Sequence, residues 1–567
     1  MIPTTAPPIN PGQDELQLPL VKETVKVNLG PSEGKDYRGS ALCHVGDLDG
    51  NGVDDLVLGA YGDDTTAPDA GAIIILYLRK DVENPVISWR KVTSGVGGLN
   101  TRLQALDYFG AAVAGIGDVD GDGMSDMVVG ALGDDEAALN AGAVYLLYMQ
   151  RDANTPVASF VKITGGKGGF DATMAQNSYF GSSVAYLGDV DGNGVGDIAV
   201  GAYGEDKLAG VVYILFLQNS ATMPVLGWYK VRAKTPGFPF FLAPSDAFGA
   251  SVAGIGDVDG DGVPDLAVGA YMDKDFQPGG GAVYILLLQR PAGAALAARG
   301  LVPGGNSPVK VTVKITPGTR GFGDTSLQAN AYFGASVAGF RDLDLDGVPE
   351  LLVGAIGDNR ANPNAGAIHL LLLGVNTTGD GLPMVKEWRK ITTNLEGFKG
   401  QLPANTNFGA SLAELPDLNG DNETEMAIGC YVASNASIYF LYKNSLTSIS
   451  ESPPQIYAVA PSLLDTLGGE NVSMALSIDV TTVNLAQPYT VEAYLGLSPC
   501  LEPSLTPYGD TAAIMRALAG GKASRLVSAT VGPQGGIAAI PPEPEGSDGG
   551  DKAAAAVATA GAPTSLV

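Results

Sequence analysis

The sequence predicts an all-β fold, a β-propeller of six four-stranded blades, with seven blades as the alternative. Glycine makes up 78 of the 567 residues, which indicates many tight turns. One phrase also recurs six times, at intervals of 68 to 85 residues, and such a period indicates one supersecondary unit per copy stacked on its neighbours. The copies are YFGAAVAGIGDVDGDGMSDMVVGA (108–131), AFGASVAGIGDVDGDGVPDLAVGA (247–270), YFGASVAGFRDLDLDGVPELLVGA (332–355) and the segments 37–60, 179–202 and 407–430.

Each copy predicts four strands in a fixed order. The first is the small, apolar segment after Phe-Gly, such as 250–255, and it ends in an acidic cluster that turns the chain. The second is a short apolar run, such as 266–270, and the third is a strongly β-prone run after a polar loop, such as GAVYILLL at 281–288. The fourth carries a Trp-x-Lys type of phrase, such as WRKVT at 89–93. Short strands bounded by Gly, Asp, Asn and Pro favour an all-β array over βαβ units.

The number of fourth strands predicts how the ring closes. Six copies of the first three strands exist, but only five Trp-x-Lys strands lie between them, and the sixth matches VKETVKVNL at 21–29. An N-terminal strand that completes the last blade closes a ring, whereas a linear solenoid would not need it. In the alternative of seven blades, the seventh blade would be built from divergent strands after residue 450.

Composition and charge exclude several classes of protein. The net charge is −28, so we expect no nucleic-acid partner, which would require a basic face. The sequence contains no apolar run of 18 residues and therefore predicts no membrane span. The N-terminus shows no recognisable signal peptide. Three cysteines, Cys43, Cys430 and Cys500, form neither a disulfide framework nor a zinc site. The two histidines, His44 and His369, are expected to be packing residues.

The six acidic clusters predict hairpin calcium loops. They follow the pattern D-x-[DN]-x-[DN]-[GN]-x-x-[DE], in which positions 1, 3, 5 and 9 offer side-chain oxygens and position 7 a backbone carbonyl. Gly at position 6 permits the turn, and Asn422 in the last copy can also adopt the left-handed conformation. Such a set suits Ca²⁺, which takes roughly six to eight oxygen ligands, better than the tighter Mg²⁺ octahedron. An EF-hand is excluded because position 12 is apolar and lies in a strand. We therefore expect about six Ca²⁺ ions, and we expect them to support folding because the carboxylates repel one another without metal.

The predicted ligands are the residues at positions 1, 3, 5, 7 and 9 of each cluster. They are Asp47, Asp49, Asn51, Val53, Asp55; Asp118, Asp120, Asp122, Met124, Asp126; Asp189, Asp191, Asn193, Val195, Asp197; Asp257, Asp259, Asp261, Val263, Asp265; Asp342, Asp344, Asp346, Val348, Glu350; and Asp417, Asn419, Asp421, Glu423, Glu425.

The recurrent phrase runs from Phe-Gly through D-x-D-x-D-G-x-x-D to Val/Ile-Gly-Ala. This order resembles the FG-GAP repeat of the integrin alpha-chain propeller. The resemblance covers about residues 20–445, although Arg38 replaces the aromatic residue in the first copy. It implies that the calcium loops lie on a lower face and that partners meet the upper loops. Four upper-loop carboxylates are the predicted partner-binding residues, Asp63, Asp64, Asp134 and Asp135. It also implies an aromatic cage at the ring centre, to which Tyr108, Tyr179 and Tyr332 would contribute.

The remaining segments are predicted from shorter patterns. Residues 1–19 are an N-terminal extension, and residues 453–540 are predicted to form an immunoglobulin-like module, whose start resembles an IPT/TIG domain. Residues 541–567 have the low complexity of a disordered tail. Four N-x-[ST] sequons, at Asn376, Asn422, Asn435 and Asn471, are compatible with a glycoprotein.

Together these features predict a calcium-stabilised recognition or adhesion protein outside the cell or at its surface, with a protein or glycan ligand on the face opposite the calcium loops. A structural component of an extracellular coat or appendage is one alternative, and the non-catalytic propeller of a secreted hydrolase is another. The chain itself is predicted not to be an enzyme, because it lacks G-x-S-x-G, H-E-x-x-H and Walker phrases.

Overall fold

The computed structural model describes residues 20–28, 36–291, 307–377, 379–430 and 437–443, and six short strands beyond residue 455. The chain divides into two compact units, one formed by Pro19–Asn444 and the other by Met1–Leu18 with Ser445–Val567. Each unit is described here by itself.

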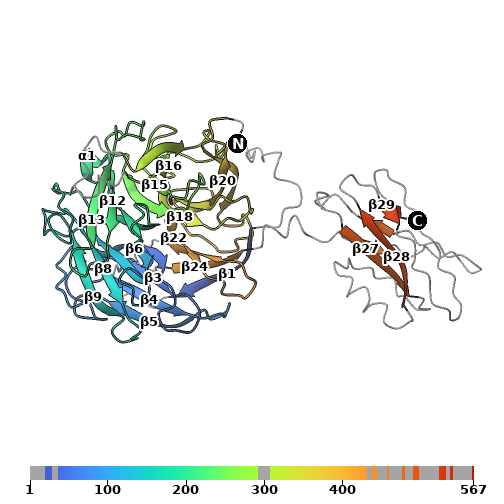
Figure 1. Ribbon diagram of the computed structural model, residues 1–567, viewed down its shortest axis with the longest axis horizontal. Coiled ribbons are helices and arrows are strands. Elements are labelled where there is room, and N and C mark those ends of the chain that lie inside the picture. The colour runs from blue at the N-terminus through green and yellow to red at the C-terminus, as the bar shows by residue number, and fades with distance from the viewer. Residues whose placement is uncertain are drawn as a thin grey trace, which may run out of the picture. The chain divides into compact units, whose positions relative to one another are not determined.

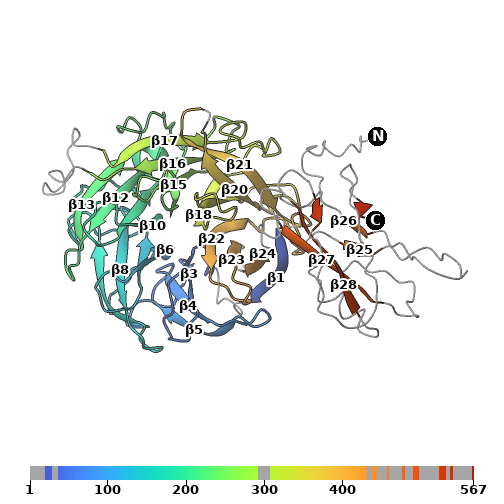
Figure 2. The same cartoon turned by 45° about the vertical axis from the view of Figure 1, so that its right-hand side comes forward.

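The larger unit is a six-bladed β-propeller in which every blade is a four-stranded antiparallel sheet (Figures 1 and 2). The prediction of six blades is therefore confirmed. Blade 1 contains β2 (Leu42–His44), β3 (Leu56–Ala60), β4 (Ala72–Leu78) and β5 (Val86–Val92). Blade 2 contains β6 (Phe109–Gly117), β7 (Asp126–Ala131), β8 (Ala143–Met149) and β9 (Val157–Ile163). Blade 3 contains β10 (Ser183–Gly188), β11 (Asp197–Ala202), β12 (Val211–Leu217) and β13 (Val225–Val231).

The second half of the ring repeats this order. Blade 4 contains β14 (Phe248–Gly254), β15 (Leu266–Ala270), β16 (Ala282–Leu288) and β17 (Val309–Ile315). Blade 5 contains β18 (Phe333–Phe340), β19 (Glu350–Ala355), β20 (Ala367–Val375) and β21 (Pro383–Ile391). Blade 6 contains β22 (Phe408–Leu415), β23 (Glu425–Cys430), β24 (Ser437–Lys443) and β1 (Val21–Asn28). Within the described residues the propeller has one helical turn, α1 (Glu205–Leu208).

The ring closes through its N-terminal strand, as the strand count predicted. β1 pairs antiparallel with β24, so residues from the two ends of the propeller form one sheet. In Figure 2 the blue β1 lies directly beside the orange-brown β24. This pairing covers the outer edge of β24, which would otherwise present unpaired backbone groups to solvent.

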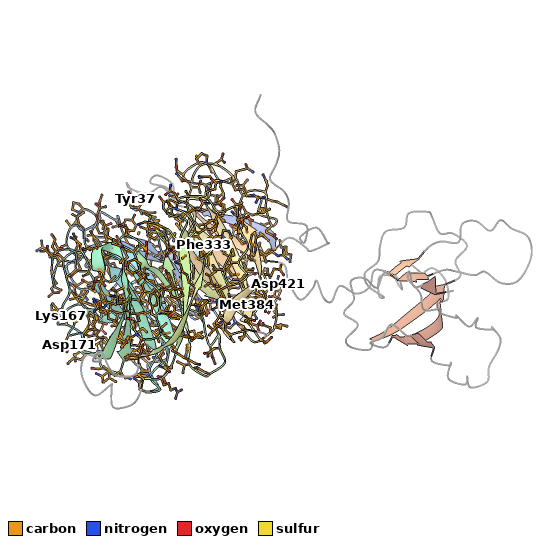
Figure 3. The ribbon with its side chains drawn as sticks, turned by 90° about the horizontal axis from the view of Figure 1, so that it is seen from above. Tyr37, Lys167, Asp171, Phe333, Met384 and Asp421 are labelled. Carbon is orange, nitrogen blue, oxygen red and sulfur yellow. The ribbon has the colours of Figure 1, made fainter. Side chains whose placement is uncertain are left out.

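The hydrophobic core lies between neighbouring blades. The second and third strands are buried on both faces, and one continuous cluster joins Val128 and Leu146 of blade 2 to Val200 and Leu215 of blade 3. Phe333, labelled in Figure 3, is fully buried and belongs to the cluster that joins blades 4 and 5. A run of consecutive apolar residues is what a strand enclosed on both faces requires.

The glycines of the recurrent phrase let adjacent blades approach closely. A Cβ atom on Gly130, in the Gly-Ala end of β7, would lie 2.0 Å from the carbonyl oxygen of Gly181, in the Phe-Gly start of blade 3. Gly181 also has a φ of 86°, a conformation that side chains rarely adopt. The two glycines therefore belong to one interblade contact.

The smaller unit contains two three-stranded sheets. One consists of β25 (Ile456–Ala458), β26 (Leu476–Ile478) and β30 (Ser565–Leu566), and the other of β27 (Tyr489–Gly496), β28 (Ala523–Val531) and β29 (Ile537–Ala539). These strands do not form a seventh four-stranded blade. The immunoglobulin-like module at 453–540 and the tail at 541–567 stay predictions, since most of their residues lie outside the described ones, as does the extension 1–19.

Candidate functional site

The six acidic loops occupy the same end of the propeller, because each one joins the first strand of its blade to the second. Their first aspartate organises the turn. In blade 1, Asp47 Oδ1 accepts hydrogen bonds from the backbone N–H groups of Gly50 and Asn51 at 2.7 and 3.0 Å, and Asp47 Oδ2 accepts one from Gly52 at 2.8 Å. Asp118, Asp189 and Asp257 accept the same three bonds in blades 2, 3 and 4.

The turn requires left-handed backbone at positions 4 and 6. Gly50 and Gly52 have φ values of 81° and 85° in blade 1, and Asn422 at position 6 of blade 6 has a φ of 65°, as the sequence predicted. Leu345 at position 4 of blade 5 also has a positive φ, 59°, although a branched side chain is strained there.

The last carboxylate of every loop is buried, and in blades 1 to 5 it connects the loop to the third strand. Asp55 Oδ2 accepts a hydrogen bond from the N–H of Leu48 at 3.0 Å, and Asp55 Oδ1 accepts one from Leu78, at the end of β4, at 2.9 Å. Burial, together with the charges of Asp49 and Asp47, raises the pKa of Asp55 to about 7. Burial likewise raises the pKa of the corresponding carboxyl group to about 6, 8, 7 and 8 at Asp126, Asp197, Asp265 and Glu350.

The donor atoms fit a hard cation. In blades 1, 3, 4 and 5, ligand atoms from positions 1, 3 and 9 lie within 4.8 Å of one another, and in blade 2 those from positions 1, 3 and 5 do. In blade 4, Asp259 Oδ1 is buried and has no hydrogen-bond partner. An oxygen buried without a partner costs free energy that a bound cation would offset. In blades 1 to 5, three of the predicted ligands of each loop are thus brought together, while calcium ligation and the carbonyl at position 7 stay proposals.

At the opposite end, the four predicted partner-binding carboxylates divide into two kinds. Asp63 and Asp134 are 2% and 1% exposed, and they pair with Lys91 and Lys162 of their own blades. Although burial opposes it, the hydrogen bond from Lys91 lowers the pKa of Asp63. Two such buried, paired groups are unsuited to direct contact with a partner.

Asp64 and Asp135 are exposed instead. Each caps its loop, since Asp64 accepts a hydrogen bond from the N–H of Asp69 at 2.7 Å and Asp135 one from Asn140 at 2.6 Å. Only these two of the four can meet a partner directly.

The buried lysine–carboxylate pair recurs in five blades, which the sequence reading missed. The lysine of the Trp-x-Lys phrase reaches the carboxylate three residues beyond the Gly-Ala end of the second strand, and this constant spacing was the available signal. The pairs are Lys91–Asp63, Lys162–Asp134, Lys230–Glu205, Lys314–Asp273 and Lys390–Asp358.

Tyrosine side chains gather at this same end, where the second strand finishes and the first begins. Tyr37 stacks on Tyr61 with ring centroids 4.8 Å apart, and Tyr61 meets Tyr108 of the next blade edge-on at 5.9 Å. Tyr179 stacks on Tyr203 at 5.2 Å. Farther along the ring, Tyr271 of blade 4 contacts Tyr332 of blade 5 at 5.8 Å. These seven half-buried residues are called the tyrosine ring below, and they include the three predicted cage residues.

The residue before each Phe-Gly dipeptide has left-handed backbone. Tyr108, Tyr179 and Tyr332 have φ values of 55°, 54° and 57°, and the equivalent Ala247 and Asn407 have 57° and 51°. A bulky residue held in this region costs about 1–3 kcal/mol and persists only where its surroundings impose it. The blade geometry therefore fixes the direction of these tyrosines.

Of the two histidines, His44 is exposed at the end of β2 and His369 is fully buried. His369 Nε2 lies 2.8 Å from Asp324 Oδ2, and Lys390 Nζ lies 3.3 Å from the same oxygen. His369 packs edge-on against Phe322 and Phe333, as expected of a packing residue, and the buried Asp324 was not anticipated.

Comparison with known proteins agrees with this architecture. A model of the FG-GAP repeat matches residues 39–76 and 248–286, which lie in blades 1 and 4. Integrin alpha-4 of Xenopus laevis is 33% identical over 165 residues, which cover 29% of this chain and 14% of that protein. Human integrin alpha-IIb is 35% identical over 174 residues, which cover 30% of this chain and 15% of that protein. The chain thus aligns with only a small part of these relatives' length.

Among solved structures, an exotype rhamnogalacturonan lyase aligns over 74% of this chain and 75% of its own, at 12% identity and a TM-score of 0.32. So low a score carries no conclusion. No helix among the described residues is long and apolar enough to cross a membrane. The chain thus folds as a six-bladed β-propeller, carries sequences that match the FG-GAP repeat in two of its blades, and is similar to integrin alpha chains over about 30% of its length.

Proposed function

We propose that this chain is a calcium-stabilised recognition or adhesion scaffold that works outside the cell and binds a protein or glycan ligand through the end that carries the tyrosine ring. The observation that carries this proposal is the tyrosine ring itself, which lies at the end opposite the acidic loops and has four of its seven members on left-handed backbone. Tyrosine offers an apolar body and a hydroxyl group, and it is enriched at interfaces for that reason. Rigid sheets that present such residues are preorganised for binding.

The acidic loops support a structural role for calcium at the other end. They share one backbone pattern in several blades, and in each of blades 1 to 5 they bring three carboxylates together. A hard cation would neutralise them and connect the first two strands of every blade. An extracellular setting agrees with this, since ordinary millimolar calcium would fill hairpin loops of moderate affinity. We also propose that the chain has no catalytic activity of its own.

The binding face is tested by two matched sets of variants. The first joins Tyr61→Ser, Tyr203→Ser, Asp64→Ser and Asp135→Ser, and the second joins Arg79→Ser and Arg151→Ser, which follow third strands at the calcium-loop end. Both sets are applied to arrays of purified extracellular proteins and of glycans, with calcium and with chelator. The proposal expects the first set to lose binding with its melting temperature in calcium unchanged, and the second set to bind as the parent does.

Loss of binding only in the second set would place the ligand at the calcium-loop end. Turnover of an ester or glycan substrate by the intact chain would contradict the non-catalytic proposal.

A further inference from the structure

The acidic loops of blades 2 and 4 form a matched pair within one molecule. They read DVDGDGMSD at 118–126 and DVDGDGVPD at 257–265, so their first six residues and their ninth are identical. Both loops carry aspartate at all four side-chain ligand positions. Within the nine residues the loops differ only at Met124 and Ser125 against Val263 and Pro264, none of which is a predicted side-chain ligand. The residues beside the loops are therefore the place to look for a difference in calcium affinity.

One residue beside the acidic loop differs between blades 2 and 4, and it lies at the β-bulge of the fourth strand. In β9, Ala158 is the extra residue between Val157, which faces Met149, and Ser159, which faces Tyr148. In β17, Lys310 is the extra residue at the same register position, between Val309 and Val311, which face Leu288 and Leu287. The structural position is the same in both blades, but one side chain is a methyl group and the other carries a charge.

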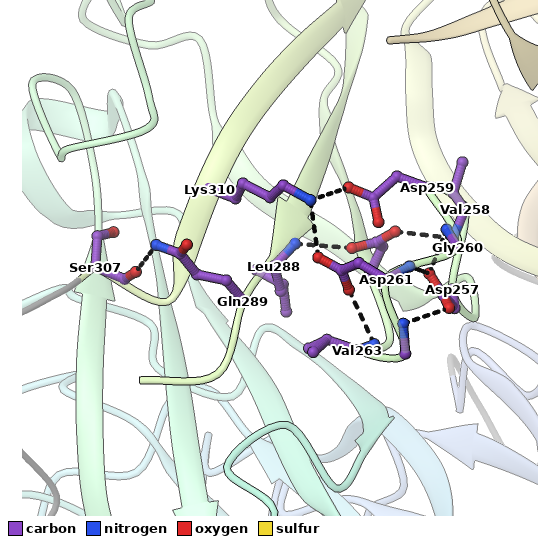
Figure 4. A network of polar contacts seen from close by, with 12 residues as sticks. Asp257, Val258, Asp259, Gly260, Asp261, Val263, Leu288, Gln289, Ser307 and Lys310 are labelled. Carbon is purple, nitrogen blue, oxygen red and sulfur yellow. Dashed lines mark hydrogen bonds and ion pairs between the residues drawn. The ribbon is translucent and has the colours of Figure 1, made fainter. Parts of the chain in front are cut away.

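Lys310 uses this position to reach the loop of its own blade. Its Nζ atom lies 2.7 Å from Asp259 Oδ2 and 2.8 Å from Asp261 Oδ2, the third and fifth loop positions (Figure 4). Blade 5 repeats the arrangement, because Lys386 is the bulge residue of β21 and bonds both Asp344 and Asp346. Across the described part of the chain, no ion pair reaches any of the four aspartates of the blade 2 loop.

The ammonium group leaves room for a metal ion. Lys310 engages only the Oδ2 atom of Asp259, while Asp259 Oδ1 is buried without a hydrogen-bond partner and its side chain is 10% exposed. The lysine therefore stands beside the ligand set as an extra positive charge. Together with the four ligand aspartates, whose charge is −4, it gives a net charge of −3. This is also the charge of the ligand positions in blades 1 and 3, where Asn51 and Asn193 stand at position 5.

We propose that the bulge residue of the fourth strand sets the calcium affinity of the loop in its blade, so that blade 2 holds the tightest site and Lys310 and Lys386 weaken those of blades 4 and 5. This inference rests on the proposal that the loops bind calcium. The physical reason is that a cation a few ångströms from a divalent ion repels it, and the repulsion is only partly screened near the protein surface. Calcium affinity is then tuned without any change in the ligands.

The test exchanges the two bulge residues in the full chain. Calcium is titrated into metal-free protein in competition with a chromophoric chelator, which counts the sites in each affinity class. The parent is expected to show one site whose calcium affinity is at least about tenfold higher than that of the rest. Asp120→Asn is expected to remove this site. Lys310→Ala is expected to give two such sites and Ala158→Lys none, while the double exchange restores one. Lys399→Ala, at an exposed lysine outside the acidic loops, makes the same charge change and serves as the control.

Melting in chelator gives a second readout that needs no bound calcium. Lys310→Ala should melt lower than the parent by a few degrees, because Asp259 and Asp261 lose their counter-charge, and calcium should abolish this difference. Unchanged site numbers in both exchanges, or equal effects from Lys399→Ala, would overturn the inference. Six sites of equal affinity would overturn it while leaving the calcium proposal intact, whereas a parent that binds no calcium would overturn both.

Discussion

Val25 in β1 lies directly opposite Phe440 in β24, although 415 positions (440 − 25) separate them in the chain. The two strands run antiparallel, and their register continues from Glu23 and Tyr442 to Asn28 and Ser437. The propeller is thus closed by hydrogen bonds between its two ends, and the last blade has no outer strand until the first residues of the propeller join it.

Removal of the closing strand should destabilise the ring. Deletion of residues 1–30 is expected to lower the melting temperature and promote aggregation, because the edge of β24 becomes available to other chains. Differential scanning fluorimetry and light scattering measure the two effects. Deletion of residues 1–19, which ends just before β1, is the control and should melt as the full chain does. Equal behaviour of the two deletions would show that closure contributes little.

Calcium removal should lower stability more than any single loop variant does. We expect chelator to lower the melting temperature strongly, and Ca²⁺ to restore it far better than Mg²⁺, because the loops offer many oxygens in a flexible geometry. Asp120→Ala should cost about one bound ion by elemental analysis of the calcium-loaded protein. An identical melting curve with and without chelator would contradict a structural role for calcium.

The buried pair of Lys314 and Asp273 should be costly to break. Lys314 Nζ lies 2.7 Å from Asp273 Oδ2, and the two side chains are 9% and 2% exposed. Lys314→Met leaves a buried carboxylate without its counter-ion, so the free energy of unfolding is expected to fall by about 3–5 kcal/mol in urea denaturation. The double variant Lys314→Met with Asp273→Asn should recover much of this loss, because no unpaired charge remains. A loss below about 1 kcal/mol in the single variant would show that the pair is dispensable.

The buried His369 should make stability depend on pH. Burial lowers the pKa of His369, opposed by the hydrogen bond to Asp324 and assisted by the positive charge of Lys390, so the folded protein disfavours the protonated ring. In the unfolded chain the ring gains a proton below about pH 6.5. The unfolded state therefore binds more protons near that pH, and stability falls as the pH is lowered through it.

His369→Tyr tests this dependence with the residue that other blades use. The register places His369 opposite Val353, where Tyr145 faces Val129 and Tyr284 faces Val268. Urea denaturation at pH 7 and pH 5 should show that the variant loses less stability on acidification than the parent does. The same loss in both proteins would assign the pH dependence to other groups.

The repeated elements were predictable, because each is specified by a local pattern. Phe-Gly, the acidic cluster and Gly-Ala mark the first two strands and their turn, and the apolar run marks the third strand. The left-handed backbone at Asn422 followed from its place in the turn, and β1 followed from counting fourth strands. The partner-binding carboxylates stay a prediction that follows from the resemblance, and no local pattern in it indicated that Asp63 and Asp134 are buried against lysines.

The sequence by itself determined the blade, its four strands, the number of blades and the residues of each acidic loop, because these depend on spacing within about 70 residues of chain. Only the tertiary structure decided which charges meet. Lys310 reaches Asp259 from 51 positions away (310 − 259) through the register of a bulge, and Tyr61 meets Tyr108 across a blade boundary. The physical reason is that strand pairing and blade packing place side chains a few ångströms apart irrespective of their separation in the chain, and the energy of a charge or an aromatic ring depends on that distance.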